Sequence, residues 1–292
     1  MDKEKILQAG KIASQVREYA RGFIKKDMLL VEIANKIEDK VIELGAKPAF
    51  PTCLSINDHA AHYSPSHDDP TTAHGLLKID FGAHIDGWIS DTAFSIDLEG
   101  TEENKKLIEA SEKALDNAIN TIKENVEIRE IGKKVNEAME SYGFSPIINL
   151  FGHSLEQYDL HAGISIPNFD NQDKEKIISG LYAIEPFSTS GNGKIYDGKP
   201  SGIYRLLDDK NIRSPIAREV LELIIEEYQT LPFCSRWIVK KFGTKALFGL
   251  KQLEENGNIH HYPVLVENSH KNVAQTEHTI LVEGDKITVT TK

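Results

Sequence analysis

The feature that most constrains the fold is the run LLKIDFGAHIDGWISDTAFSID at residues 76–97. It consists of two stretches rich in β-favouring residues, with Asp86-Gly87 between them. Asp-Gly is favoured in two-residue turns between antiparallel strands, because both turn positions need a left-handed backbone. The run therefore predicts a β-hairpin in which Ile85 faces Trp88.

This hairpin brings two aspartates together. With a two-residue turn, Asp80 pairs with Ala93 and Asp91 pairs with Gly82, so the aspartates are diagonal neighbours on one face, roughly 7–8 Å apart at the backbone. Buried carboxylates need a charge partner, which one or two shared cations would provide. On this pair alone, an exposed and solvated face with two unrelated aspartates is the simpler interpretation.

Helical periodicity surrounds the hairpin. Apolar residues that recur every three or four positions predict a helix ending at Leu44, with Asp27 as its N-cap and Gly45 after its C-terminus. Residues 59–72 are polar and rich in Pro, Ser and Asp, which is typical of a loop. Two helices are predicted after the hairpin, the first with Thr101 as its N-cap.

The second half of the chain repeats this order coarsely. An extended run, SPIINLFGHS, precedes a predicted strand at LYAIEPF that contains Glu185. Helices are predicted from Ser214 to Glu255, and three strands close the chain, with Glu277 in the apolar run TEHTILV. This repeated order permits a duplicated α+β core.

The acidic and imidazole side chains suggest a metal site. Glu185 and Glu277 bring the number of carboxylates expected on β elements to four. His153 follows an apolar run at the point where a strand opens into a loop, a good position from which to present an imidazole. Oxygen-rich ligand sets with one His suit Mn, Fe(II), Co or Zn, and two such metals would form a hydrolytic centre.

Charge and cysteine content exclude several classes of function. The chain has 34 Lys and Arg against 45 Asp and Glu, a net charge of −11, which argues against binding nucleic acid or an anionic membrane through bulk charge. No apolar run is long enough for a membrane span, and the first residues contain no signal-peptide core, so we expect an intracellular setting. Cys53 and Cys234 are too few for a disulfide framework and are expected to be packing residues.

Six segments together resemble the methionine aminopeptidases of peptidase family M24, specifically the type 2 branch in its short archaeal form. Any one segment would be weak evidence, but jointly they are specific and cover nearly the whole chain. The segments are AFPT at 49–52, AAHYSP at 60–65, KIDFGAHIDGWISDTAFS at 78–95, GHSLEQYDLHAG at 152–163, YAIEPF at 182–187 and EHTILV at 277–282.

The resemblance implies an α+β pita-bread fold, also called the creatinase/aminopeptidase fold, in which two pseudo-twofold related halves enclose one dinuclear metal site. It further implies a single catalytic domain over residues 1–292, with a helical, winged-helix-like subdomain inserted at 200–262. Winged helices can bind DNA, but the stretch from Ser214 to Glu255 has equal numbers of basic and acidic residues. With no basic stripe, DNA binding is not expected.

The resemblance also implies the site residues. Two divalent cations (Co, Mn, Fe(II) or Zn) would be held by five ligands, of which Asp91 and Glu277 would be shared: Asp80, Asp91, His153, Glu185 and Glu277.

Four residues have further implied roles. Glu185 would act as general base, and His161 would stabilise the oxyanion of the intermediate. His62 would contact the scissile amide or donate a proton toward the leaving amine. Phe50 would line the methionine pocket, although ordinary core packing explains it as well.

The implied function is metal-dependent removal of N-terminal methionine from peptides and nascent proteins, preferentially before a small second residue. We expect a cytoplasmic monomer that contacts the ribosome, if at all, through local patches, and that binds no membrane. A Pro-specific peptidase of the same fold (prolidase or aminopeptidase P) shares the five-ligand pattern, and a non-catalytic binding relative is a second alternative. The AAHYSP and GHSLEQYDLHAG motifs and the helical insertion favour methionine removal.

Overall fold

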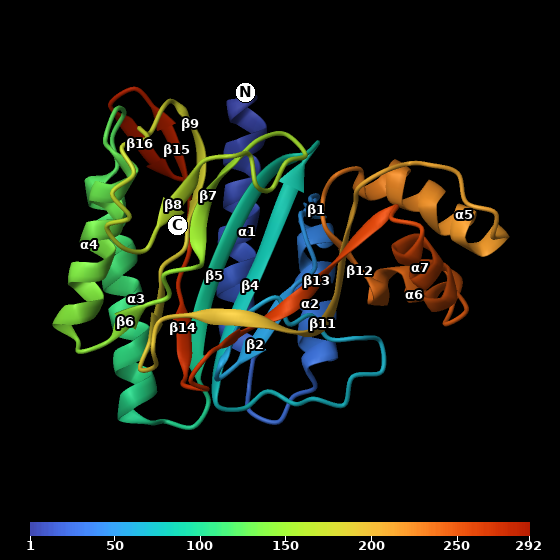
Figure 1. Ribbon diagram of the computed structural model, residues 1–292, viewed down its shortest axis with the longest axis horizontal. Coiled ribbons are helices and arrows are strands. Elements are labelled where there is room, and N and C mark those ends of the chain that lie inside the picture. The colour runs from blue at the N-terminus through green and yellow to red at the C-terminus, as the bar shows by residue number, and fades with distance from the viewer.

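The computed structural model describes residues 1–292. Its first part contains α1 (Lys3–Phe23), α2 (Leu30–Glu43), β1 (Lys47–Pro48), β2 (Cys53–Ile56), β3 (His59–Ala61), β4 (Leu76–Ile85) and β5 (Trp88–Asp97). Strands β1, β4 and β2 are neighbours in one sheet, and β5 also pairs with β4. Figure 1 shows α1 behind β4 and β5, and the buried faces of α1 and α2 form one core cluster with this sheet.

A second part, on the left in Figure 1, is built from a five-stranded sheet, a three-stranded sheet and two helices. It contains α3 (Glu102–Thr121), α4 (Ile128–Ser141), β6 (Ser145–Pro146), β7 (Phe151–Leu155), β8 (Ser165–Pro167), β9 (Gly180–Ile184), β10 (Phe187–Thr189), β14 (Val273–Gln275), β15 (His278–Glu283) and β16 (Lys286–Val289). The five-stranded sheet has the order β16-β15-β9-β7-β8, the three-stranded sheet has the order β14-β10-β6, and the apolar faces of α3 and α4 pack on the five-stranded sheet.

The two parts follow the same plan. Helices α1 and α3 have 21 and 20 residues, and α2 and α4 have 14 residues each. In each pair, a residue with positive φ turns the chain between the helices: Asp27 at 68° and Asn125 at 66°. The predicted α+β duplication is therefore confirmed. The prediction that Asp27 is the N-cap of α2 is wrong, because Leu29 occupies that position and Asp27 forms the turn before it.

The hairpin has the predicted register, with Ile85 opposite Trp88 and Gly82 opposite Asp91. Asp86 and Gly87 both have positive φ, at 47° and 82°, as the favoured two-residue turn requires.

A long ribbon of two strands crosses the front of the molecule and leads to the helices on the right in Figure 1. It consists of β11 (Ile195–Leu206) and β13 (Ile259–Glu267), and between them lie α5 (Pro215–Leu223), the π-helical turn η1 (Ile224–Tyr228), β12 (Phe233–Cys234), α6 (Ser235–Phe242) and α7 (Ala246–Glu255). These helices enclose their own apolar cluster, which includes Val220, Ile238 and Leu250. The boundaries 200–262 for an inserted subdomain stay a prediction.

Residues 59–72 are mostly loop, as predicted, but residues 59–61 form β3, which pairs with β13, a partner about two hundred positions later that no local pattern reveals. Strand β11 was not predicted, because Gly198, Pro200 and Gly202 interrupt its pattern and its pairing is irregular there. Glu185 and Glu277 lie just outside strands β9 and β15 rather than within them.

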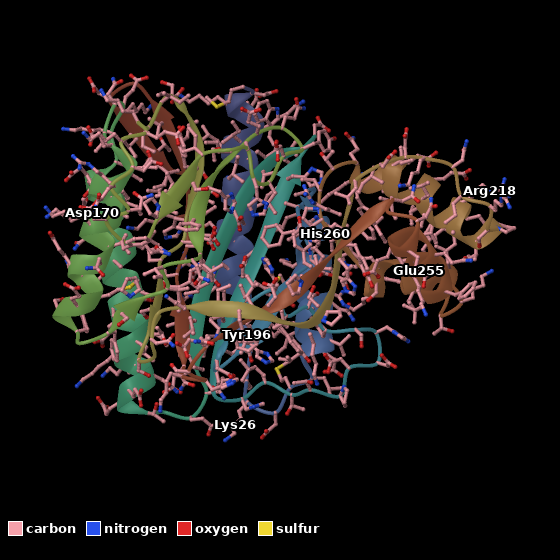
Figure 2. All side chains as sticks on the ribbon, in the orientation of Figure 1. Lys26, Asp170, Tyr196, Arg218, Glu255 and His260 are labelled. Carbon is pink, nitrogen blue, oxygen red and sulfur yellow. The ribbon has the colours of Figure 1, made fainter.

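The outer faces of the molecule carry charged side chains. Figure 2 shows Arg218 and Glu255 on the helices between β11 and β13, where both are exposed. It shows Lys26 and Asp170 at other edges of the molecule. No helix is both long enough and apolar enough to cross a lipid bilayer.

Candidate metal centre

The seam between the two parts is where β5 meets the segment before β15. The Glu277 N–H donates to the Ala93 carbonyl at 2.9 Å, and the Thr92 hydroxyl donates to the Glu277 carbonyl at 3.0 Å. The Asp91 N–H donates to Thr279 Oγ1 at 2.7 Å, and that hydroxyl donates to the Asp91 carbonyl at 2.8 Å. Asp91 and Glu277, more than 180 positions apart, are thus fixed side by side by backbone bonds.

All five predicted ligands converge on this seam. One possible ligand atom from each of Asp91, His153 and Glu277 lies within 4.8 Å of the others. Glu185 joins this group, with its Oε1 at 3.6 Å from His153 Nε2. Asp80 is linked to Glu185 through Gln275, whose Nε2 lies 3.2 Å from both Asp80 Oδ2 and Glu185 Oε2.

Burial disfavours the charged form of every member of the cluster. It raises the pKa of Asp80 to about 7. Burial and then the neighbouring carboxylates raise the pKa values of Asp91, Glu185 and Glu277 well above their ordinary values. Burial also lowers the pKa of His153 to about 3, so the imidazole is neutral at pH 7. A neutral imidazole is the form that binds a metal.

Several carboxylate oxygens in the cluster are buried without a hydrogen-bond partner: Asp80 Oδ1, Asp91 Oδ1 and both oxygens of Glu277. Native proteins leave few buried polar atoms unpaired, and crowded carboxylates without a counter-charge are costly. These unpaired oxygens, together with the His153 imidazole, are ligands of the kind that divalent cations bind.

A cavity of about 300 Å³ opens onto this cluster, and Asp80, Asp91, His153 and Glu185 line it. Its closed side consists of apolar residues, among them Phe50, Cys53 and Ile203, which are 7%, 3% and 4% exposed. Its exposed lining residues lie in two segments, 149–151 and 161–165, which form its solvent-facing side. The cavity is therefore a blind pocket beside the cluster, with one open side.

The predicted pocket residue Phe50 lines the closed side and also packs in a core cluster. Its ring lies over Gly82, where an added Cβ would sit 2.5 Å from Phe50 Cε1. A glycine on β4 is thus what lets this ring reach the cavity, and both interpretations of Phe50, pocket wall and core packing, describe it.

The two other predicted histidines also line the cavity. The ring of His161 lies 4.4 Å from that of His153, centroid to centroid, and although His161 as a residue is exposed, desolvation of its ring lowers its pKa. His62 has a φ of 65°, which is strained for a non-glycine residue, and burial lowers its pKa to about 4. Its Nδ1 has no partner, and its ring meets Tyr262 edge-on at 5.6 Å.

Sequence reasoning missed two contributors to this site. Gln275 is the amide that joins Asp80 to Glu185, and its position two residues before Glu277 was the available signal, because residues i and i+2 share a face of an extended chain. Tyr262 lines the cavity from β13, and nothing local in the sequence distinguishes it.

Both cysteines are free and buried, as expected of packing residues. Cys53 lines the cavity, but burial raises the pKa of its thiol well above the ordinary value. A thiol that keeps its proton is a poor metal ligand, because metals bind the thiolate.

Comparison with known proteins agrees with this geometry. The model of metallopeptidase family M24 matches residues 4–284. A methionine aminopeptidase of Pyrococcus abyssi is 46% identical over 297 residues, with both chains fully covered. Among solved structures, a thermophilic Arx1 has a TM-score of 0.84 at 15% identity (98% of this chain and 89% of that chain), and a methionine aminopeptidase of Thermotoga maritima has a TM-score of 0.71 at 20% identity (100% and 98%). The chain therefore belongs to metallopeptidase family M24 and, within it, to the methionine aminopeptidases.

Proposed function

We propose that this protein hydrolyses the first peptide bond of chains that begin with methionine. The observation that carries the proposal is a blind pocket, with buried apolar residues in its wall, beside a cluster of five possible ligand side chains in which several carboxylate oxygens have no partner. A pocket with one open side accepts a single terminal side chain, and the rest of the peptide has to leave through that side. Cleavage after the first residue follows from this shape.

Asp80, Asp91, His153, Glu185 and Glu277 would hold two divalent cations. Such a pair supplies a water of lowered pKa and a positive field over the scissile carbonyl. A set with one imidazole and otherwise oxygen atoms suits Mn, Fe(II), Co or Zn.

The protein's own groups perform the proton transfers. Glu185, 14% exposed in the cavity, accepts a proton from the attacking water as general base. His161, uncharged at pH 7 because its pKa is lowered, donates a hydrogen bond to the carbonyl oxygen as negative charge develops there. His62, held in place against Tyr262, contacts the scissile amide or donates toward the leaving amine.

Specificity comes from the two sides of the cavity. Phe50 on the closed side would contact the methionine side chain, an apolar group that fits a pocket of this size. His62 and His161 would lie beside the second residue of the substrate, and their proximity favours a small side chain there.

We also propose that residues 200–262 form an inserted subdomain of a single catalytic domain. Its helices have a core of their own, and its strand β11 contributes Ile203 to the closed side of the cavity. We expect the protein to act as a cytoplasmic monomer on peptide and nascent-protein N-termini, and to contact the ribosome transiently through local surface patches.

Peptide cleavage tests the proposal. Chelator-treated protein is incubated with Met-Ala-Ser and with Ala-Pro-Ala, each with and without Mn or Co, and Asp91→Ala is the control. We expect metal-dependent release of methionine from Met-Ala-Ser only, and none from the variant. Cleavage of Ala-Pro-Ala instead would indicate a Pro-specific peptidase, and cleavage of neither peptide would indicate a non-catalytic binding protein.

A further inference from the structure

The open side of the cavity contains one large apolar side chain that the proposed chemistry does not use. Phe151, the first residue of β7, is 38% exposed. Of the large apolar side chains that are exposed, it alone lines the cavity. An exposed Phe gains little from core packing, and its place in the cavity wall makes this ring available to a bound ligand.

The geometry of β7 places this ring relative to the metal centre. Phe151 and His153 are two positions apart on one strand, so their side chains share a face, spaced by roughly 7 Å along the strand. His153 is 7% exposed, so the step from His153 to Phe151 leads from the buried centre toward solvent. The pairing of Phe151 with Pro167 and of His153 with Ser165 on β8 holds this direction rigid.

A substrate peptide that leaves through the open side has the same spacing. In an extended peptide, residues 1 and 3 lie on the same side and are also roughly 7 Å apart. A peptide that runs along β7 with residue 1 beside the metal centre brings residue 3 level with Phe151. We propose that Phe151 is a specificity-determining residue that contacts the third residue of the substrate and favours an apolar side chain there. This inference rests on the proposed function.

Competing tripeptides test it. The values of kcat/KM are measured for Met-Ala-Leu and Met-Ala-Ser with wild-type protein, with Phe151→Asn, and with Phe151→Leu as the conservative variant. We expect wild-type protein to prefer Met-Ala-Leu by about tenfold, mainly through KM, because one apolar contact discriminates by about tenfold or more. The ratio should fall toward one in Phe151→Asn and recover in Phe151→Leu.

Tyr142→Asn is the matched control, because Tyr142 is also 38% exposed but does not line the cavity. It should keep the wild-type ratio. A wild-type ratio near one, or a ratio that Phe151→Asn leaves unchanged while methionine is still released, would overturn the inference and leave the proposed function standing. Failure of wild-type protein to release methionine from either peptide would instead contradict the proposed function.

Discussion

At the scale of single residues, the protein accepts an unfavourable local arrangement in its metal centre. Asp91 and Glu277 are 4% and 1% exposed, and each has at least one carboxylate oxygen with no partner. Carboxylates in this condition repel one another and favour the protonated form. The arrangement persists because hydrogen bonds across the seam hold Asp91 and Glu277 in place. Energetically unfavourable local arrangements of this kind are concentrated at functional sites.

Asp91→Asn should separate stability from activity. We expect methionine release to fall by at least about a hundredfold, since loss even of a group that supports a ligand costs tenfold to a hundredfold. In chelator, the free energy of unfolding should rise by about 1 kcal/mol, because one of the crowded buried carboxylates is removed. Urea unfolding and a methionine-release assay measure the two effects, with the exposed Asp116→Asn as control. A less stable metal-free Asp91→Asn would contradict this account of the centre.

His84 should make stability depend on pH. Burial, and then Lys47, lower the pKa of His84 from 6.5 to about 4, and its Nδ1 accepts a hydrogen bond from the Gly87 N–H at 2.9 Å. Asp86 acts in the opposite direction. The folded state disfavours protonation of His84. The contribution of His84 to the free energy of unfolding therefore keeps its full value above pH 6.5 and falls as pH drops from 6.5 toward 4.

The size of the effect follows from linkage and amounts to about 2 kcal/mol at about pH 5. On going from about pH 7.5 to about pH 5, the free energy of unfolding of the wild type should therefore become lower, relative to that of His84→Asn, by about 2 kcal/mol. The comparison isolates His84, since the metal-centre carboxylates, whose raised pKa values act with the opposite sign, are the same in both proteins. Equal pH dependence in the two proteins would refute the assignment.

At the scale of elements, contacts between segments far apart in sequence hold the site loops. The Tyr158 N–H donates to the Gly87 carbonyl at 2.9 Å, the Gln157 side chain donates to the Asp86 carbonyl at 2.8 Å, and Thr230 Oγ1 donates to the Tyr158 carbonyl. The β4–β5 turn and the helical insertion thus hold the loop that carries His161 from two sides.

Gly87→Ala should disturb this loop. Gly87 has a φ of 82°, and an added Cβ would overlap the ring of Tyr158. We expect a loss of stability of about 2 kcal/mol or more, together with a lower kcat as His161 shifts. Gly100→Ala is the matched control, since Gly100 has a similar φ of 72° but no atom within 4 Å of the added Cβ. Equal losses of stability and of kcat in the two variants would show that the contact between residue 87 and Tyr158 does not position the loop.

Glu38 joins α2 to α6. Its carboxylate accepts two bonds from Arg236, at 2.7 and 2.8 Å, one from Trp237 Nε1 at 2.7 Å and one from the Thr52 N–H at 3.1 Å. Glu38→Ala would leave a buried guanidinium without its partner, so the free energy of unfolding should fall by about 3–5 kcal/mol.

Glu43→Ala is the control on the same helix, because its pair with Lys40 is largely exposed and contributes little. The double variant Glu38→Leu, Arg236→Met should recover part of the loss, since it leaves no unpaired charge but leaves Trp237 Nε1 and the Thr52 N–H without their acceptor. Urea unfolding gives all three values. A cost for Glu38→Ala no larger than that for Glu43→Ala would show that this buried pair does not join the elements.

At the scale of the whole molecule, the metal centre belongs to neither part alone. Asp80 and Asp91 come from the first part, and His153, Glu185 and Glu277 come from the second. Divalent cations bound there should tie the parts together, and a cation present at about a hundred times its Kd should stabilise the fold by about 2.7 kcal/mol. Calorimetry should therefore show a Tm that rises when Mn is added to chelator-treated protein, with a smaller rise for Asp91→Asn. A wild-type Tm that does not respond to metal would contradict this coupling.

The sequence alone determined the features whose causes are local. The Asp86-Gly87 turn set the register that places Asp80 and Asp91 on one face, and the periodicity of apolar residues identified most helices. The joint motifs then identified the family. Strand β11 and the bridging role of Gln275 were not predicted, because each depends on a partner far away in the chain. The convergence of ligands spread from Asp80 to Glu277, and the exposure of Phe151 at the cavity exit, were likewise decided only by tertiary structure. Turn chemistry and helical spacing act over a few residues, whereas strand pairing and burial depend on which segments meet.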